Sequence, residues 1–450
     1  MNLISKYNIP VPRYTSYPTV PFWDNQLTAD AWLENVKETF RSSNSKEGIS
    51  LYIHLPYCES LCTYCACNTR ITVNHAVEKP YMEALLKEWK MYLSTFDDVP
   101  LIKEIHLGGG TPTFFSAENL AVLLKDILST CKVSEHHFFS FEGHPSNTTV
   151  EHLTTLNQLG FDRVSFGIQD FDDKVQTAIN RHQTVEEVKH VVESARKIGY
   201  TSINFDLVYG LPFQTKSSME NTLKKVVELK PERIAFYSYA HVPWIKPGQR
   251  KFTELDLPVE HEKRALYELG LHYFSEAGYH GVGMDHFALP GDELLVSLTK
   301  GTLHRNFMGY TAGKTSLMIG LGVSAIGDSW TAFAQNSKVV EEYLKLIQEN
   351  KLPFQRGHQL SNQDIFLRQH ILNIMCKGQT YFTANEFGQY LYSKIKERMS
   401  ELFADGLVLI ENNQLHVTET GKAFLRNICL CFDERYHESE VKENKFSQAI

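Results

Sequence analysis

Between about residues 50 and 245, short apolar segments rich in β-branched and aromatic residues alternate with longer stretches of helical periodicity. This alternation is typical of βα units arranged around a parallel sheet. Six units predict an α/β fold in the form of a partial barrel. The predicted strands are Leu51–Leu55, Ile102–Leu107, His137–Phe141, Arg163–Gly167, Ile203–Val208 and Ile234–Tyr239.

The pattern changes on both sides of these units. The later segments Tyr279–Ala288 and Ser316–Gly327 are strand-like or glycine-rich, and we expect them to extend the sheet or close its open side. Beyond about residue 360, amphipathic helices precede a short hairpin, Gly406–Val417, as in a winged-helix unit. We therefore predict an N-terminal arm or lid over residues 1–48, a barrel with its extension over 49–345, and a mainly α-helical, winged-helix-like domain over 346–450.

Each predicted strand ends at an unusual residue. Active sites of parallel barrels gather at this end of the strands, where the βα loops converge. We expect all six ends to contribute to one site. In chain order the ends carry a cysteine-rich loop, the triple glycine 108–110, Glu142, Gln169, the Asp206–Gly210 segment and Tyr239-Ala240-His241.

The cysteine-rich loop carries Cys58, Cys62, Cys65 and Cys67. Three thiolates can hold three irons of a [4Fe–4S] cluster and leave the fourth iron open for chemistry. Zinc sites usually offer two separated cysteine pairs, so the spacing favours iron–sulfur over zinc. Cys67 is the alternative fourth ligand, which would leave only an electron carrier. We interpret it instead as a residue near the site.

The formal charge of −8 argues against general affinity for nucleic acid or anionic membranes, so a polyanionic substrate would need a local basic pocket. The hairpin region also lacks the basic stripe of a DNA-binding domain. No segment has the length and apolarity of a signal peptide or a membrane span, and we expect a soluble, cytoplasmic protein. The four cysteines outside the loop are expected to be free buried thiols.

The Cys-x3-Cys-x2-Cys loop followed by Gly-Gly-Gly-Thr-Pro resembles the radical S-adenosylmethionine (SAM) superfamily. The finer pattern, including a match for Cys67, resembles its oxygen-independent coproporphyrinogen III oxidases (dehydrogenases), and the agreement covers nearly the whole chain. The segments that carry it are Pro12–Thr19, Gly167–Phe171, Asn180-Arg181, Asp206–Pro212, Tyr239–His241, Gly283–Ala288, Leu303–Phe307, Gly322–Ile326 and Arg426–Cys429.

The resemblance implies that Cys58, Cys62 and Cys65 hold the cluster and that SAM chelates its free iron. It also implies two SAM molecules. One departure is His144, which stands where the family pattern often has Asp before Pro. By matching positions, the SAM contacts would be Tyr52, Tyr64, Gly109, Gly110, Thr111, Glu142, Gln169, Arg181, Asp206, Ala240 and Ile326.

The resemblance further implies a reaction of haem biosynthesis. A SAM-derived 5′-deoxyadenosyl radical would abstract hydrogen from a propionate of coproporphyrinogen III, and loss of carbon dioxide would leave a vinyl group. A second round would give protoporphyrinogen IX. We expect a reducing donor such as flavodoxin or ferredoxin, and a monomer. Our hypothesis is that Arg13, Arg250 and Arg305 anchor substrate propionates, because Arg suits bidentate carboxylate binding.

Three other functions remain open from the sequence. A haem chaperone on the same barrel shares the three cysteines, but typically lacks the match to Cys67 and to the Pro12–Thr19 arm. A related enzyme that opens haem or methylates its substrate is a second alternative. A DNA-binding regulator is the third, and salt-sensitive duplex binding would reveal it.

Overall fold

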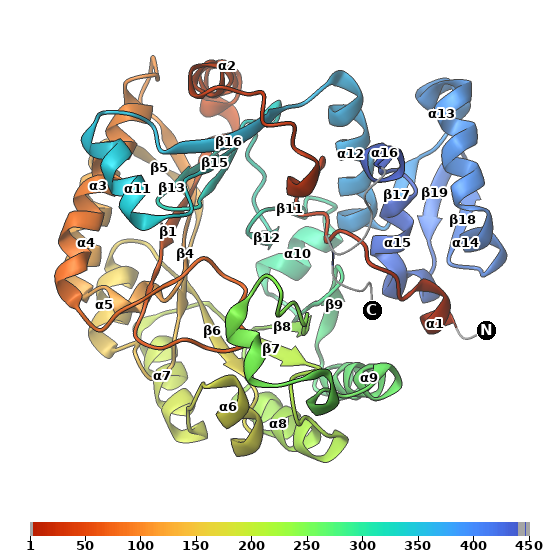
Figure 1. The fold of residues 1–450 in the computed structure, drawn as a ribbon, viewed down its shortest axis with the longest axis horizontal. Helices are drawn as coiled ribbons and strands as arrows, with labels where there is room; N and C mark the ends of the chain where they lie inside the picture. Colours follow the sequence, from red (N-terminus) through yellow and green to blue (C-terminus); the bar gives the residue numbers. More distant parts are fainter. Residues whose placement is uncertain (1–2, 440–445, 447–450) are drawn as a thin grey trace.

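Six parallel strands form the centre of the computed structural model, which describes residues 3–439 and 446. They are hydrogen-bonded in chain order, and Figure 1 shows them curving into an open barrel. The six predicted strands are therefore present, and the partial α/β barrel is confirmed. The bounds are β1 (Ile49–Leu55), β4 (Leu101–Gly109), β5 (Lys132–Gly143), β6 (Arg163–Gln169), β7 (Ser202–Tyr209) and β8 (Arg233–Ser238).

Helices cover the outer face of this barrel, which is the arrangement expected when each parallel strand is followed by a crossover helix (Figure 1). Local sequence fixes where they begin. At the start of α7, the Thr184 hydroxyl accepts from the Glu187 N–H, and the Glu187 carboxylate accepts from the Thr184 N–H. The outer helices are α3 (Glu78–Leu93), α4 (Ala117–Leu128), α5 (Val150–Gln158), α6 (Asp173–Ile179), α7 (Val185–Ile198), α8 (Lys216–Leu229) and α9 (Glu260–Glu276).

Further strands extend the sheet on both sides of the six. β9 (His280–Val282) and β10 (His286–Ala288) continue it beyond β8, in the segment predicted to be strand-like. On the other side, β13 pairs in parallel with β1, and three antiparallel strands follow it. These strands are β13 (Met318–Leu321), β14 (Ile326–Asp328), β15 (Ala332–Asn336) and β16 (Phe354–Gln359).

The sheet therefore runs past residue 345, where the sequence placed the start of the C-terminal domain, because β16 pairs with β15. The intervening helix α11 (Val340–Gln348) packs against α3 on the outside of the barrel. The three-part division of the chain remains a prediction, but these contacts favour a later second boundary.

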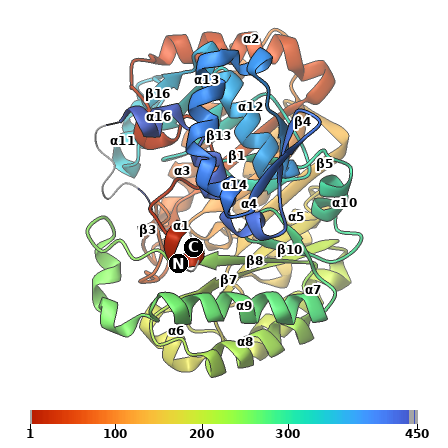
Figure 2. The same ribbon diagram turned by 90° about the vertical axis from the view of Figure 1, so that its right-hand side faces the viewer.

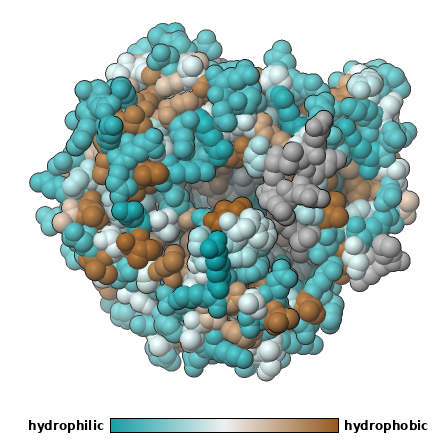
Figure 3. Space-filling model, viewed as in Figure 1, coloured by the Kyte–Doolittle hydropathy of each residue, from teal (hydrophilic) through white to brown (hydrophobic). Residues whose placement is uncertain are grey.

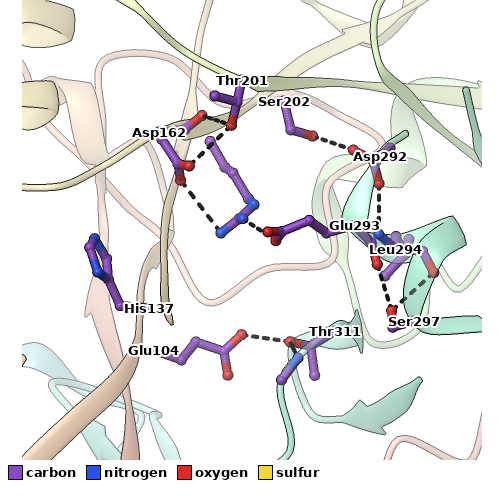
Figure 4. A network of polar contacts seen from close by, with 12 residues as sticks. Glu104, His137, Asp162, Thr201, Ser202, Asp292, Glu293, Leu294, Ser297 and Thr311 are labelled. Atoms are coloured by element: carbon purple, nitrogen blue, oxygen red, sulfur yellow. Dashed lines mark hydrogen bonds and ion pairs between the residues drawn. The ribbon is translucent and has the colours of Figure 1, made fainter. Parts of the chain in front are cut away.

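Polar contacts close the barrel at the N-terminal ends of β6, β7 and β8 (Figure 4). Asp292 accepts from Ser202 Oγ at 2.8 Å and from Arg233 Nε at 2.6 Å. The next residue, Glu293, begins the helix α10 (Glu293–Thr299) and pairs with Arg163 of β6. With this end occupied by α10, the opposite end of the strands remains for a site. A short hairpin of β11 (His304–Asn306) and β12 (Gly309–Thr311) follows α10.

The N-terminal arm connects the two sides of the molecule. It begins with α1 (Leu3–Tyr7), runs between the C-terminal region and the barrel, and leads to α2 (Ala29–Glu47), which covers β15, β1 and β4 (Figure 1). Arg426 donates to the carbonyls of Val11 and Pro12, and the Tyr14 hydroxyl donates to Asp433. Only the first half of the predicted arm is thus an extended arm, because its second half is a sheet-covering helix.

The C-terminal region is mainly helical, as predicted, and carries a small sheet. Its strands lie in the order β17-β19-β18. The predicted hairpin turns at Asn412 and Asn413, whose positive φ values of 50° and 65° suit a two-residue turn. Figure 2 views this region in front of the barrel. Its elements are α12 (Asn362–Lys377), β17 (Gln379–Tyr381), α13 (Ala384–Arg398), α14 (Ser400–Ala404), β18 (Val408–Glu411), β19 (Gln414–Val417), α15 (Leu425–Leu430) and α16 (Glu434–Glu438).

Among the helices of residues 3–439, none combines the length and apolarity that a membrane crossing requires. Of the four cysteines outside the loop, three are buried as predicted and one is not. Cys376, Cys429 and Cys431 are buried, Cys131 is half-buried, and all four are free thiols.

Candidate active site

A cavity of about 290 Å³ opens at the C-terminal ends of the barrel strands. The cysteine-rich loop lies on one side of it, and residues from β4, β5, β6 and β7 lie on the other. Five of the six predicted strand ends therefore converge on this cavity, whereas β8 contributes Tyr237 in place of the predicted Tyr239-Ala240-His241. Of the predicted site residues, the cavity is lined by Cys58, Cys62, Cys65, Cys67, Tyr64, Gly109, Gly110, Thr111, Glu142, Gln169, Arg181 and Asp206.

The cysteine loop is held by short strands and by contacts to its sulfurs. Cys58 lies in β2 (Tyr57–Cys58), which pairs with β3 (Arg70–Ile71), and its sulfur is 3.3 Å from Thr111 Oγ1. Arg181 Nη1 lies 3.7 Å from the Cys62 sulfur. No three His, Cys, Asp or Glu side chains of the described residues converge on one ion position. The three thiols of Cys58, Cys62 and Cys65 share one cavity, as a [4Fe–4S] cluster with one open iron requires.

The thiols differ in their ease of ionisation. Burial raises the pKa of Cys58 to about 11 and also raises that of Cys62, against the opposing effect of Arg181. A hydrogen bond from the Cys67 thiol lowers the pKa of Cys65, and the Cys67 N–H donates to the same sulfur at 3.4 Å. Cys67 thus lies against a predicted ligand, as expected for a residue near the site.

The glycine turn brings bare backbone to the cavity. Gly109 adopts a φ of +115°, which favours glycine, and its N–H donates to Glu142 Oε2 at 3.1 Å. A Cβ on Gly110 would lie 2.5 Å from the Pro56 carbonyl oxygen. The glycines therefore let β4 close against the start of the cysteine loop while their backbone faces the cavity.

Two carboxylates face the cavity from β5 and β7. Loss of hydration opposes the ionisation of Glu142, but hydrogen bonds from His106 and Gly109 hold its pKa below the usual range. Asp206 accepts from Ser165 and Asn204 at 2.9 Å each, yet burial and the neighbouring Glu142 raise its pKa to about 6. Of the two carboxylates, Glu142 is therefore the one that the site holds in its ionised form, and it is the better partner for a cation.

Arg181 provides the positive charge of the cavity. Its guanidinium donates to the Gly167 carbonyl from Nε at 3.0 Å and from Nη2 at 2.5 Å. A Cβ on Gly167 would lie 2.7 Å from Gln169 Nε2 and 2.8 Å from Arg181 Nη2. Glycine at this position therefore allows both side chains to sit over the end of β6. Gln169 itself has a φ of +63°.

Three predicted SAM contacts lie outside the cavity lining. Tyr52 stacks near His106, with ring centroids 6.0 Å apart. Ala240 lies in the loop after β8, where Gln249 Nε2 donates to the carbonyls of Ala240 and Tyr64 at 3.3 and 3.2 Å. Ile326 begins β14, on the far side of β13 from β1.

The three arginines proposed as propionate anchors separate into two places. Arg305 Nη2 donates to the Arg13 carbonyl at 3.3 Å, and the Arg13 guanidinium pairs with Asp285 at 3.4 Å. Arg305 is 4% exposed, lies over the Tyr310 ring, and its Nε has no hydrogen-bond partner among the described residues. Arg250 donates to the Pro243 carbonyl of its own loop, and no contact among the described residues joins it to the other two.

Several cavity residues were missed from the sequence. Ser165 and Tyr237 line it from β6 and β8, and His144 lines it beside Glu142. Strand alternation could have found Ser165, which lies two residues before Gly167 on the same face. Burial and the charge of Arg181 lower the pKa of His144 to about 3, so this departure from the family pattern is a neutral imidazole.

Comparisons with known proteins agree with this geometry. The profile of the radical SAM superfamily matches residues 52–226. Oxygen-independent coproporphyrinogen III oxidase of Escherichia coli strain K12 is 36% identical over 100% of this chain and 98% of its own length. The corresponding Synechocystis enzyme is 35% identical over 100% of this chain and 97% of its own length. The chain belongs to the oxygen-independent coproporphyrinogen III oxidase family.

The fold agrees over the same extent. The solved structure of E. coli coproporphyrinogen III oxidase, described as a radical SAM enzyme, superposes with a TM-score of 0.88 and 35% identity. The superposition covers 94% of this chain and 97% of the E. coli chain. The family identified from sequence is thus confirmed, and the likeness includes the arm and the C-terminal region as well as the barrel. Family membership favours an oxidase over the haem-chaperone and DNA-binding alternatives.

Proposed function

We propose that this chain converts coproporphyrinogen III to protoporphyrinogen IX without oxygen, by oxidative decarboxylation of two propionates to vinyl groups. One observation carries the proposal. Three thiols, an ionised carboxylate and a guanidinium line a single cavity in a chain that matches the named oxidases along its whole length. The reaction is an oxidation and belongs to haem biosynthesis.

The cavity suits the two cofactors that the family implies. Cys58, Cys62 and Cys65 would hold a [4Fe–4S] cluster, and its fourth iron would bind SAM. When bound, this pair supplies the strong hydrogen abstractor that no side chain provides, a 5′-deoxyadenosyl radical. Glu142 would meet a cationic group of SAM, and Asp206 would accept hydrogen bonds from its hydroxyls. The glycine backbone of residues 109 and 110 would approach SAM closely.

Eight of the eleven proposed contacts line one cavity, and we assign all eleven to two SAM molecules by the side of the barrel from which they come. One group is on or beside β1, β4, β5 and β14, and the other is on or beside β6, β7, β8 and the cysteine loop. The first group comprises Tyr52, Gly109, Gly110, Thr111, Glu142 and Ile326. The second comprises Tyr64, Gln169, Arg181, Asp206 and Ala240.

Replacement of Gly167 by alanine tests the second group. The new Cβ would displace the ends of the Gln169 and Arg181 side chains, which lie within 2.8 Å of its position. We expect the Michaelis constant for SAM to rise about 10-fold, the equivalent of roughly one hydrogen bond to a charged group. Gly281→Ala is the matched control, since nothing lies within 4 Å of the position of its Cβ. Equal Michaelis constants in the two variants would remove Gln169 and Arg181 from the SAM site.

The substrate would occupy the barrel interior next to SAM. A second cavity of about 260 Å³ shares Glu142, Ser165, Asp206 and Tyr237 with the first and extends to Tyr310. Arg305 lies over the Tyr310 ring, 4.4 Å from its centroid, which supports a role for Arg305 near a propionate. Arg13 is joined to Arg305 by a hydrogen bond and would act beside it. Arg250 has weaker support because its guanidinium is held within its own exposed loop.

Arg305→Ala tests this placement. Loss of a charged hydrogen bond of about 1.5–3 kcal/mol should raise the Michaelis constant for coproporphyrinogen III about 10- to 100-fold. The Michaelis constant for SAM should stay unchanged. Arg305→Lys, which keeps the charge and part of the packing, should recover part of the loss. An unchanged constant for the porphyrinogen in Arg305→Ala would exclude Arg305 as an anchor.

Arg13 and the arm would also cover the barrel mouth, since Arg13 Nη2 donates to the Ser238 carbonyl at the end of β8 at 3.3 Å. Deletion of residues 1–20 is a poor test of this lid, because Val11, Tyr14 and Tyr17 are buried and their loss would destabilise the fold. Arg13→Ala is the better variant. For a lid it should preserve SAM cleavage but uncouple it from decarboxylation.

The decisive experiment for the function is anaerobic incubation of reconstituted protein with SAM, dithionite and coproporphyrinogen III. Mass analysis should find the two-vinyl product and 5′-deoxyadenosine. Conversion of haem instead would favour the related haem-modifying enzymes, and haem binding with no product would favour a chaperone. We further propose that the chain acts as a monomer and receives electrons from a protein such as flavodoxin or ferredoxin.

A further inference from the structure

Exposed apolar side chains gather outside the mouth of the cysteine-lined cavity. Single exposed apolar residues need no explanation, but a group of them at one place is typical of a contact surface. These come from two loops, and we call the group the apolar rim. It consists of Leu61, Ile71 and Val73 from the cysteine loop and its continuation, and Trp244 and Ile245 from the loop after β8, with exposures of 40–75%.

Contacts between the two loops make the rim one surface. Lys246 Nζ donates to the Cys67 carbonyl at 3.1 Å. A Cβ on Gly248 would lie 3.5–3.7 Å from atoms of Leu61 and Thr63, so the two loops are in contact there. Leu61 and Ile71 also line the cavity itself. The rim is therefore the outer surface of the loop that carries the proposed cluster ligands. Figure 3 shows apolar side chains beside the hollow in the middle of this face.

Cations surround the rim, although the chain as a whole is acidic. Lys246, Arg250 and Lys251 follow Ile245 within six residues, and the side chains of Lys246 and Arg250 donate to the neutral carbonyls of Cys67 and Pro243. Burial, Arg356 and Lys246 all lower the pKa of Lys338, whose carbonyl binds the Asn68 side chain. Positive groups on this face are thus close enough to repel one another.

The nearby carboxylates are engaged with other groups. Glu341 pairs with Arg70, and Asp256 caps the turn at Thr253. Glu59 accepts from Asn147, and Glu254 faces His241. Asp256, Glu59 and Glu254 keep their charges, but Lys246, Arg250, Lys251 and Lys338 outnumber them, so the rim combines an apolar centre with a margin of net positive charge.

We propose that the apolar rim is the docking surface for a small acidic one-electron carrier protein of the flavodoxin class. The inference rests on the proposed function, which needs a supply of electrons. Interfaces of this kind join an apolar centre to complementary charges that steer association. The reduced flavin of the carrier would lose one electron, the oxidised cluster would gain it, and cleavage of one C–S bond of SAM would consume it.

The five rim residues are not among those that line the second cavity, which provides room for substrate. Electrons can therefore enter through the outer side of the cysteine loop while the porphyrinogen occupies the inner side. This separation makes the two roles independently testable.

The test compares two reductants on the full-length reconstituted protein. Porphyrinogen turnover is measured with reduced flavodoxin and, separately, with dithionite, which needs no docking surface. The rim variants are Trp244→Ala combined with Ile245→Ser, and Lys251→Glu. The controls are Val150→Ser and Lys189→Glu, at exposed positions on the outer helices or their ends.

We expect the rim variants to raise the flavodoxin concentration for half-maximal rate by about 10-fold, in keeping with the loss of an interface anchor or a steering charge. Dithionite-driven turnover should stay unchanged, and the controls should match the parent with both reductants. The Lys251→Glu variant should also show a weaker dependence on ionic strength.

Three results would overturn the proposal. The first is an unchanged flavodoxin response in the rim variants. The second is an equal loss with dithionite, which would place the rim in catalysis. The third is a raised Michaelis constant for the porphyrinogen with dithionite, which would make the rim a substrate entrance. Failure of the proposed function is distinct, because the parent protein would then give no vinyl product with dithionite.

Discussion

Replacement of Cys62 by serine is expected to abolish formation of 5′-deoxyadenosine. Serine lacks the thiolate that a cluster iron needs, so the proposed ligand set is reduced to Cys58 and Cys65. Arg181 Nη1 lies 3.7 Å from the Cys62 sulfur, and a cation cannot replace the ligand. Iron and sulfide analysis of anaerobically reconstituted protein, with electron paramagnetic resonance after reduction, should find the cluster lost.

Cys131→Ser is the matched control. Cys131 is a half-buried thiol that donates to the Ile127 carbonyl at 3.2 Å, far along the chain from the cysteine loop. Its serine variant should keep the full iron content and activity. Cys67→Ser separates the remaining alternatives, because a residue near the site should leave the cluster intact and alter turnover alone. Full iron content in Cys62→Ser would contradict the proposed ligand set.

Replacement of Glu142 by glutamine is expected to weaken SAM binding by at least about 100-fold. The change leaves a cationic group of SAM without its carboxylate in a site that bound SAM would itself close from water, at a cost of about 3–5 kcal/mol. The backbone geometry should survive, since an amide oxygen can still accept from the Gly109 N–H. Equilibrium binding of SAM to the reconstituted protein measures the effect directly.

Glu104→Gln provides the comparison. Glu104 is another carboxylate of the barrel, on β4, but it accepts from Ser50 and Thr311 at the opposite end of the strands. Its variant should bind SAM as the parent protein does. If Glu142→Gln retained parental affinity, SAM would have to be held by other residues.

The strand ends were predictable from sequence because each combines two local signals. Glu142 and Gln169 end apolar runs, so a polar side chain must emerge where the strand leaves the core. Parallel βα order then brings all such ends to one rim. The Gly108–Gly110 turn was predictable because it also follows an apolar strand, and its backbone faces the cavity as expected.

Contacts that depend on distant pairing were not predictable. His106 supports Glu142 only because β4 and β5 lie in register, which no local pattern specifies. Like Arg13 and Arg305, Arg250 lies in a segment that is specific to the subfamily. The fold nevertheless places it in a different loop from the other two. The predicted second domain boundary separates β16 from β15, because β16 is short and mixed in polarity and its pairing with β15 gives no periodic signal.

The clasp between Arg426 and the carbonyls of Val11 and Pro12 has a consequence for biogenesis. A ribosome releases the arm first and its binding partner nearly last, more than 400 residues later. The nascent barrel can therefore fold while its upper edge is still uncovered. The arm can therefore take its place against the end of β8 only after nearly the whole chain has been synthesised.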